Sequence, residues 1–350
     1  MMRRSIMSMA RNLLSNNNNT DINMVKAQHS VIHPDALLSV IKRHYPTIGA
    51  TDCKILALNC NDNFFIKGKR KDYVFRLNRK DWWPTTDFDE ELRFLEFLKR
   101  RKVSAVVPKR NKQNQRYVSI KTAEGTRYGA LFGYLPGRLL ARNAGSRNIN
   151  MLRMGELAAS LHKAADHFQP QAQRWTMDFN FLVTETLEGL APLFTQREKD
   201  LAYLHRLADH LQALLDDTPA ETLDFGLCHG DLHIGNVILD PDGELTLIDF
   251  DWSGYCWRIY DLATLWWALR DEQTAPQWSA VLRGYTRARK LSCQEKSLLP
   301  AFVMIREFEL LGFHLMMRKH IGDAWLDDNY YDFHMRFIRG WVKQYLLKFK

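Results

Sequence analysis

The stretch LCHGDLHIGNVILDPDGELTLIDFDWSG, residues 227–254, constrains this chain more than any other segment. It places Asn236 five residues after Asp231, and Asp249 thirteen residues further on inside an apolar run. Carboxylates in apolar surroundings are costly unless a positive group lies between them. The segments NVILD and LTLIDF flank PDGE, which is typical of a short β-hairpin. The hairpin would bring Asn236, at the start of one strand, near Asp249, at the end of the next.

An amide oxygen and a carboxylate that face each other suit Mg²⁺, which takes its remaining ligands from waters and phosphates. Asp231 lies on the loop just before the hairpin, where it would accept a proton from, or orient, a hydroxyl that attacks phosphorus. An Asp, four intervening residues and an Asn, followed by a metal-binding Asp, is the order found in the catalytic loop of kinases. The stretch therefore predicts a phosphoryl-transfer site.

The first third of the chain has the pattern of a small antiparallel sheet with one inserted helix. Strands are predicted at KILAL, NFFIK and DYVFRL within 53–79, and two more within 116–137, where Pro136-Gly137 ends the last one. Helical spacing of apolar residues predicts helices over 33–45 and 86–101.

From about residue 150 the pattern becomes helical, with helices predicted over 151–168, over 206–217 and over nearly all of 277–350. The predicted fold is therefore α+β and two-lobed, with a β-rich N-lobe and a mainly α-helical C-lobe. We expect the boundaries to be a flexible leader at 1–30, the nucleotide-binding N-lobe at 31–132, a hinge at 133–137 and the C-lobe at 138–350.

Composition limits the class of protein. A chain of 350 residues with 46% hydrophobic content can bury a sizeable core in two lobes. It has no run of about eighteen apolar residues, so no membrane-spanning helix is expected. Five cysteines without a C-x-x-C pair indicate reduced thiols and a cytoplasmic protein. For residues 1–20, which contain Arg and Ser but no acid, a flexible leader or a misassigned start is favoured over an organelle transit peptide.

Charge is distributed unevenly. Residues 1–150 carry 28 Lys and Arg against 12 Asp and Glu, whereas residues 151–350 carry 21 against 28. A basic half beside an acidic half suits nucleic-acid binding. It equally suits one lobe that handles a polyanion and another that handles a metal and a neutral or cationic molecule. Composition alone does not choose between them.

The loop H-G-D-L-H-I-G-N, followed by I-D-F-D and YDLA, resembles the aminoglycoside phosphotransferase, choline kinase and homoserine kinase type II group of the kinase-like superfamily. The resemblance covers about residues 50 to 310 and is strongest at 228–262. It implies a protein-kinase-like fold and an ATP- and Mg²⁺-dependent kinase that phosphorylates a hydroxyl of a small molecule. Aminoglycoside, amino alcohol and homoserine-like acceptors stay open, as does GTP in place of ATP, and the sequence leaves the oligomeric state undetermined.

For the motif itself, the resemblance implies that Asp231 is the catalytic base or the residue that orients the hydroxyl. It implies that Asn236 and Asp249 are Mg²⁺ ligands. Asp251, from D-F-D, is a further candidate for assisting the metal or the substrate, with a simple capping role as its alternative.

Three neighbouring residues have supporting roles by the same resemblance. His229 would bond the backbone near Asp249 and fix the loop. Asp261 would be a buried structural carboxylate that closes the C-lobe. His233 stands where protein kinases carry a lysine, so it would touch the transferred phosphoryl group.

Kinases also need a cation on the third strand, held by a helix glutamate, to bind the nucleotide phosphates. YVFRLNR places Arg76 at that point, and its planar fork can bridge a phosphate and a carboxylate. DEELRFLEFL provides Glu91 as its partner, with Glu90 as the neighbouring alternative.

The rest of the nucleotide site rests on short polar and backbone contacts. No Gly-rich phosphate loop precedes the second strand, and the resemblance matches Asn63 of NCNDNFFIK to the polar loop used instead. Adenine would lie against LFGYLPG, bonded by backbone groups around Gly133 and Leu135.

The acceptor is the least determined part. Two helical segments after YDLA offer contacts, with a Met and aromatic core stripe as the alternative reading: Trp266, Trp267, Arg306, Glu307, Glu309 and His314. Two other functions stay open. One is a protein Ser/Thr kinase of the bacterial stress-kinase type on the same fold. The other is a non-catalytic module that binds RNA through a basic N-lobe, against which the intact set of Asp231, Asn236 and Asp249 argues.

Overall fold

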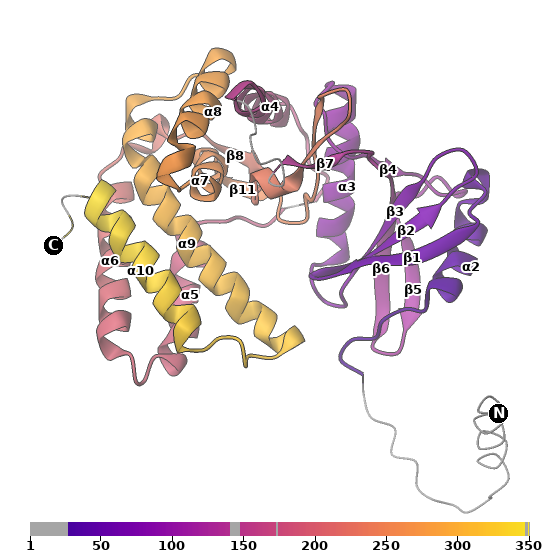
Figure 1. The fold of residues 1–350 in the computed structure, drawn as a ribbon, viewed down its shortest axis with the longest axis horizontal. Helices are drawn as coiled ribbons and strands as arrows, with labels where there is room; N and C mark the ends of the chain where they lie inside the picture. Colours follow the sequence, from indigo (N-terminus) through magenta and orange to yellow (C-terminus); the bar gives the residue numbers. More distant parts are fainter. Residues whose placement is uncertain (1–26, 141–147, 173, 347–348, 350) are drawn as a thin grey trace, which may run out of the picture.

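The computed structural model describes residues 27–140, 148–172, 174–346 and 349. These residues form two lobes that lie side by side, one built on a β-sheet and one mainly helical (Figure 1). The predicted α+β, two-lobed class is confirmed. Most of the leader predicted at 1–30 lies outside the described residues.

The first lobe contains an antiparallel six-stranded sheet, in the order β1-β2-β3-β6-β4 with β5 paired to β6. Both predicted groups of strands are present, and one short strand, β4, was not predicted. The strands are β1 (Asp52–Leu58), β2 (Asn61–Lys67), β3 (Tyr73–Asn78), β4 (Pro108–Lys109), β5 (Val118–Thr122) and β6 (Gly125–Gly133).

Both helices predicted for this lobe are present. The helix α2 (Pro34–His44) buries Leu37 and Ile41 against one face of the sheet. The helix α3 (Thr85–Arg100) lies beside the sheet on the side of the second lobe (Figure 1). Because successive side chains of a strand point to opposite faces, Phe75 joins the core with α2 while Arg76 points the other way.

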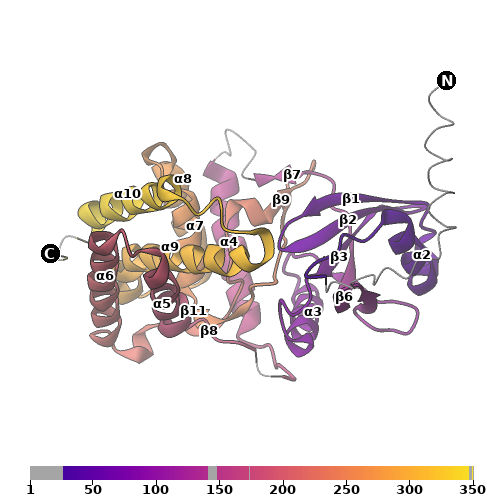
Figure 2. The same cartoon turned by 90° about the horizontal axis from the view of Figure 1, so that it is seen from below.

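Among the described residues, the second lobe contains seven α-helices and five short strands, together with short 3₁₀ helices and one π-helical turn. The long helix α9 packs against α5, α7 and α10 (Figure 2). The helices are α4 (Asn148–Ala165), α5 (Glu185–Leu190), α6 (Glu198–Asp216), α7 (Ile259–Ala268), α8 (Ala275–Ala288), α9 (Cys293–Ile321) and α10 (Asp328–Tyr345). The strands are β7 (Arg138–Leu139), β8 (Phe225–Cys228), β9 (Val237–Leu239), β10 (Leu245–Leu247) and β11 (Gly254–Trp257).

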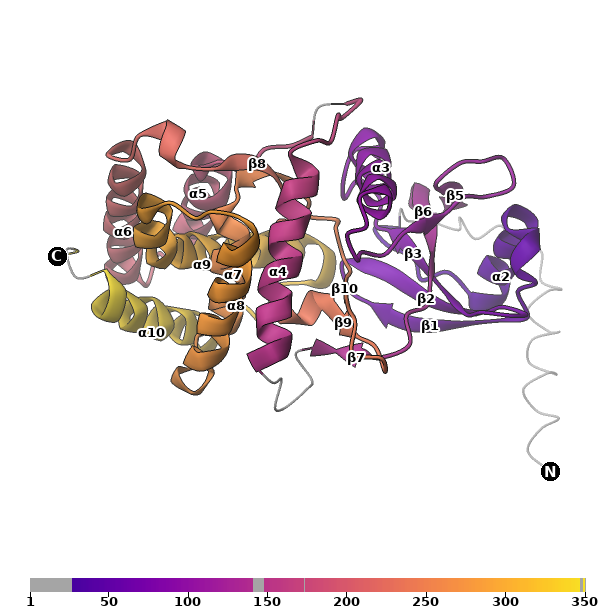
Figure 3. The same ribbon diagram turned by 90° about the horizontal axis from the view of Figure 1, so that it is seen from above.

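The predicted hairpin across PDGE is present as β9 and β10, and β7 pairs with β9 on its outer side. The hairpin lies at the junction of the two lobes (Figure 3). Two backbone hydrogen bonds tie it to the segment after α3: Leu247 N donates to Ser104 O at 3.0 Å, and Val106 N donates to Leu247 O at 2.9 Å. The end of β10, which leads to Asp249, is therefore anchored to the first lobe.

One hydrophobic core lies between α2 and the sheet, and a larger one joins the helices of the second lobe to α3 and the facing side of β6. Within the described part of the chain, none of the helices is both long enough and apolar enough to cross a membrane.

Candidate active site

The loop that carries Asp231 begins where β8 ends, and a buried carboxylate holds its backbone. Asp261 accepts hydrogen bonds from His229 N at 2.8 Å and from Gly230 N at 2.9 Å. Gly230 has φ +85°, and a Cβ on it would lie 2.1 Å from the carbonyl oxygen of Trp252. The loop therefore needs glycine at this position, because an L side chain would be strained and would clash with backbone.

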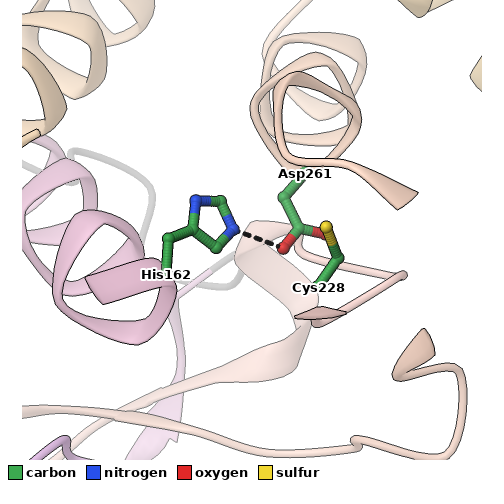
Figure 4. A group of neighbouring side chains, drawn as sticks. All are labelled: His162, Cys228 and Asp261. Atoms are coloured by element: carbon green, nitrogen blue, oxygen red, sulfur yellow. Dashed lines mark hydrogen bonds and ion pairs between the residues drawn. The ribbon is translucent and has the colours of Figure 1, made fainter. Parts of the chain in front are cut away.

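Asp261 itself is held by His162 of α4, whose Nε2 lies 2.9 Å from Asp261 Oδ2 (Figure 4). Together with Cys228 these side chains have the composition of a metal site, and all three are buried. However, His162 Nδ1 also bonds Tyr285 OH at 2.9 Å, and the Cys228 thiol donates to two backbone carbonyls. Burial raises the pKa of the Cys228 thiol well above its ordinary value. Because each group already has a partner, the cluster is explained as a scaffold for the loop.

Asp231 has both carboxylate oxygens in hydrogen bonds. Arg306 Nη2 donates to Oδ1 at 2.7 Å, and Asn236 Nδ2 donates to Oδ2 at 2.9 Å. His233 Nε2 lies 3.4 Å from Oδ2. Burial raises the pKa of Asp231, but the Arg306 guanidinium and His233 outweigh it and hold the pKa below its ordinary value. Asp231 is thus an ionised, weakly basic carboxylate that is fixed from two sides.

The hairpin brings Asn236 next to the segment that ends at Asp249. Ile248 N donates to Asn236 O at 3.0 Å, and His229 Nε2 lies 3.0 Å from Ile248 O. Asp249 has φ +63° and its side chain is half exposed. Asn236 uses its amide nitrogen on Asp231, which leaves its amide oxygen for another ligand. The contact of His229 with backbone beside Asp249 is the one that the resemblance implies.

Asp251 lies two residues beyond Asp249 and is buried. Asn61, the first residue of β2, donates to Asp251 Oδ2 at 3.0 Å and so links the two lobes. Burial and the neighbouring charge of Asp249 raise the pKa of Asp251 well above its ordinary value. Sequence reasoning missed Asn61. The available signal was its spacing of two from Asn63, which places both residues on the sheet face of Arg76.

Arg76 pairs with Glu91 of α3, as the sequence predicts. Its Nη2 lies 2.7 Å and 2.8 Å from the two carboxylate oxygens of Glu91, and both side chains are buried. Glu90 instead bonds Arg93 at 2.5 Å and the backbone of Gln171. Arg76 Nη1 lies 3.9 Å from Asp249 Oδ1, so the ion pair of the first lobe faces the hairpin of the second.

The remaining nucleotide-site predictions fall at the same junction. Asn63 is the direct partner of Arg76 across β2 and β3. Gly133 ends β6, is exposed, and has open space where a Cβ would stand. Leu135 follows on the connection to β7 and is half buried.

A cavity of about 330 Å³ lies among α5, α9 and the segment after Asp251. Phe181, Trp252, Phe313 and Glu309 contribute to its lining. The carbonyl of Trp252 packs against Gly230 of the loop, and Glu309 reaches the loop indirectly, through Arg306, which bonds Asp231.

The helix residues proposed as acceptor contacts separate into two groups. Glu309 lines the cavity and Arg306 reaches Asp231. The others are engaged in helix packing: Trp266 stacks on Trp278 at 5.1 Å, Trp267 Nε1 donates to Glu307 at 2.6 Å, and His314 bonds Tyr330 OH at 2.5 Å.

The chain is similar to known proteins along most of its length. The model of the phosphotransferase enzyme family matches residues 54–292. An uncharacterized protein of Deinococcus radiodurans is 32% identical over 326 residues, covering 91% of this chain and 93% of that protein. A homoserine kinase of Granulibacter bethesdensis is 27% identical over 275 residues, covering 72% of this chain and 79% of that enzyme.

Among solved structures, an amicoumacin kinase in complex with AMP-PNP, Ca²⁺ and amicoumacin superimposes with a TM-score of 0.72 at 20% identity. The match covers 89% of this chain and 94% of that one. At this identity the likeness concerns the fold. The family match covers more than half of the chain, and the site has the order and spacing of a kinase loop. The chain therefore belongs to the phosphotransferase enzyme family and is a phosphotransferase of the protein-kinase-like fold.

Proposed function

We propose that this protein transfers the γ-phosphoryl group of ATP, with Mg²⁺, to a hydroxyl of a small molecule. The observation that carries the proposal is the pairing of Asp231 with Asn236 beside Asp249, with Arg76 Nη1 of the other lobe 3.9 Å from Asp249 Oδ1. An acid that orients a hydroxyl, oxygen ligands for a cation and a cation for phosphates are the parts that phosphoryl transfer needs.

The donor atoms fit a hard divalent cation. Asn236 has its amide oxygen left over, Asp249 is half exposed, and both are oxygen ligands of the kind that Mg²⁺ prefers. Held there, Mg²⁺ would neutralise charge on the β- and γ-phosphates. We assign Asn236 and Asp249 as its ligands. Asp251 accepts a hydrogen bond from Asn61 and so supports the hairpin. It is also a second candidate ligand of the cation.

In the nucleotide site, we assign Arg76, positioned by Glu91, to the phosphates. Asn63 shares its sheet face, and the backbone around Gly133 and Leu135 would hold the base. His233 keeps its proton on Nε2, because its Nδ1 accepts from Gly235 N at 2.9 Å, so it can donate toward Asp231 or a phosphoryl oxygen. ATP is the expected donor and GTP is the alternative.

The acceptor would enter the cavity whose wall includes Glu309, which bonds the Arg306 side chain that in turn bonds Asp231. A volume of about 330 Å³ is at the low end of the range for small-molecule sites and favours a small alcohol over a protein segment. An amino alcohol or homoserine-like acceptor fits this size, while an aminoglycoside would have to leave part of itself outside. Because Asp231 is held ionised by a guanidinium, its role is to orient the hydroxyl rather than to act as a strong base. The thiols of all five cysteines are free, which agrees with a cytoplasmic site of action.

The test is ATP-dependent phosphate transfer measured across a panel of aminoglycosides, amino alcohols and hydroxy amino acids, with a purified protein substrate mixture alongside. We expect Mg²⁺-dependent turnover with one small-molecule class, and loss of that turnover in Asp231→Ala with an unchanged far-UV circular dichroism spectrum. Labelling of protein substrates with no small-molecule turnover would replace the proposal by the protein-kinase alternative. Turnover in Asp231→Ala equal to that of the wild type would contradict the proposed site.

A further inference from the structure

The side chain of Arg306 lies against the carboxylate to which we assign the acceptor hydroxyl. Arg306 comes from the middle of α9 and is buried. Its Nη2 donates to Asp231 Oδ1 at 2.7 Å, and its Nη1 donates to Glu309 one turn further along the helix. The guanidinium carbon lies 5.7 Å from the centre of the Trp267 ring. The guanidinium is therefore held on three sides.

This contact determines which oxygen of Asp231 can receive a hydroxyl. Each carboxylate oxygen can accept about two hydrogen bonds. Oδ2 already receives Asn236 at 2.9 Å and has His233 at 3.4 Å, whereas Oδ1 receives Arg306 alone. The acceptor hydroxyl is therefore expected at Oδ1, directly beside the guanidinium. Rotation of the carboxylate away from this orientation would break a charge-assisted hydrogen bond.

Glu309 connects Arg306 to the acceptor cavity. It lines the cavity of about 330 Å³, and its Oε2 also accepts from Tyr260 OH at 3.3 Å. A molecule in the cavity would touch Glu309. Glu309 pairs with Arg306, and Arg306 pairs with Asp231. The cavity wall and the orienting carboxylate thus belong to one chain of charged contacts.

Two other roles for Arg306 fit the geometry less well. As an anchor for an anionic group of the acceptor it would offer only its remaining N–H groups, because Nη1 and Nη2 each already donate to a carboxylate and Nε is buried. As a packing ion pair it would be complete with Glu309 alone, three residues along the same helix. The second bond instead leaves the helix and reaches Asp231, 75 residues away in the sequence.

We propose that Arg306 is a positioning residue, which holds the Asp231 carboxylate in the orientation that receives the acceptor hydroxyl and is itself held by Glu309 in the wall of the acceptor cavity. This inference rests on the proposed function. It predicts that loss of Arg306 affects the transfer step and leaves the binding of nucleotide unchanged.

The experiment compares Arg306→Met, Arg306→Lys and Arg306→Ala with the wild type. The probes are the acceptor identified in the panel and, as a second readout, hydrolysis of MgATP with water as acceptor. We expect kcat of Arg306→Met to fall about 100-fold, the size of effect that misplaced catalytic groups produce. The KM for MgATP should stay within about twofold, because Arg306 does not face the nucleotide. Arg306→Lys should retain about a tenth of the activity, since an ammonium keeps the charge but not the fork.

The matched control is Arg197→Met. Arg197 is also a largely buried arginine of the second lobe, and it pairs with Asp328 at 2.9 Å and Asp332 at 2.5 Å on α10. Its loss should lower the unfolding temperature without changing kcat.

In Arg306→Ala, guanidinium chloride at constant ionic strength should restore part of kcat, whereas sodium chloride should not.

Three results would overturn the inference. The first is a kcat of Arg306→Met within twofold of the wild type, and the second is a loss of activity that a raised KM for MgATP explains. The third is that guanidinium does not restore the activity of Arg306→Ala. If Arg306→Met is unfolded by circular dichroism, the same criteria apply to Arg306→Lys. Failure of the proposed function looks different, because the wild type and Asp231→Ala would then be equally inactive. An active wild type, an inactive Asp231→Ala and an unaffected Arg306→Met would remove the positioning role alone.

Discussion

Two buried arginine–glutamate pairs flank the site from opposite lobes, and they differ in their third partner. Arg76 with Glu91 comes from β3 and α3, and Arg306 with Glu309 comes from α9. Arg76 Nη1 lies 3.9 Å from Asp249, beyond hydrogen-bond distance, whereas Arg306 Nη2 lies 2.7 Å from Asp231. Of these two similar ion pairs, only the one with Arg306 also forms a hydrogen bond to a carboxylate of the site.

The two arginines use their terminal nitrogens differently. Arg76 spends one terminal amine on Glu91 and keeps the other facing the hairpin, where phosphates are expected. Arg306 spends both terminal amines on carboxylates. We therefore expect Arg76 to bind a ligand and Arg306 to order the carboxylate of Asp231. The following experiments separate these roles.

The largest effect is expected between the two pairs, at Asp249. Asp249→Asn should reduce turnover about 1,000-fold. A neutral amide binds Mg²⁺ more weakly than a carboxylate does, so the phosphates would lose the cation that neutralises their charge. Turnover at rising Mg²⁺ concentrations measures it. Asp242→Asn, in the exposed turn of the same hairpin, is the control and should behave as the wild type. Equal turnover of both variants would remove Asp249 from the metal site.

On the nucleotide side, Arg76→Met should raise the KM for MgATP by about tenfold or more, in contrast to Arg306→Met, which should leave it unchanged. The reason is the loss of the cation that would meet the phosphates. Steady-state kinetics and calorimetric binding of a non-hydrolysable nucleotide measure the change. Arg93→Met removes the neighbouring pair with Glu90 on α3 and should have no kinetic effect. A raised KM for MgATP in both Arg76→Met and Arg306→Met would erase the distinction between the two sides.

The smallest effect concerns stability on the acceptor side. Burial, then His334 and Arg306, lower the pKa of His314 on α9 to about 4. Between pH 6.5 and 4 the unfolded chain therefore binds a proton at His314 that the folded chain does not, so stability falls as the pH falls through this window. For a pKa lowered from 6.5 to about 4, the loss at pH 5 is about 2 kcal/mol.

His314→Gln should remove this part of the pH dependence. Urea unfolding at pH 5 and pH 7.5 measures it, and His205→Gln, in α6, serves as the control. The same difference between the two pH values in wild type and His314→Gln would show that His314 does not remain neutral in the folded protein.

Much of the site was readable from the sequence, because its parts lie within one hairpin and its flanking loop. Asp231, Asn236 and Asp249 are close in the chain, so turn chemistry and strand length were enough to bring them together. The pairing of Arg76 with Glu91 was also readable. The two residues lie on one strand and on the next helix, and the alternation of side chains along a strand and the 3.6-residue period of a helix predict which face each one occupies.

Contacts between distant segments were not readable. Asn61 meets Asp251 across 190 residues, and Arg306 meets Asp231 across 75 residues. The sequence marked Arg306 and Glu309 as candidate acceptor contacts on α9, but it did not say which face of that helix would meet the loop.

Local sequence spacing was enough to predict the class of fold, the loop and the groups that we expect to meet phosphate, because local spacing dictates local geometry. Only the packed structure shows which arginine faces the hairpin, which one bonds Asp231, and how large the cavity beside α9 is. These depend on how whole helices pack against the loop, and packing depends on the summed shape of many side chains rather than on the period of any one segment.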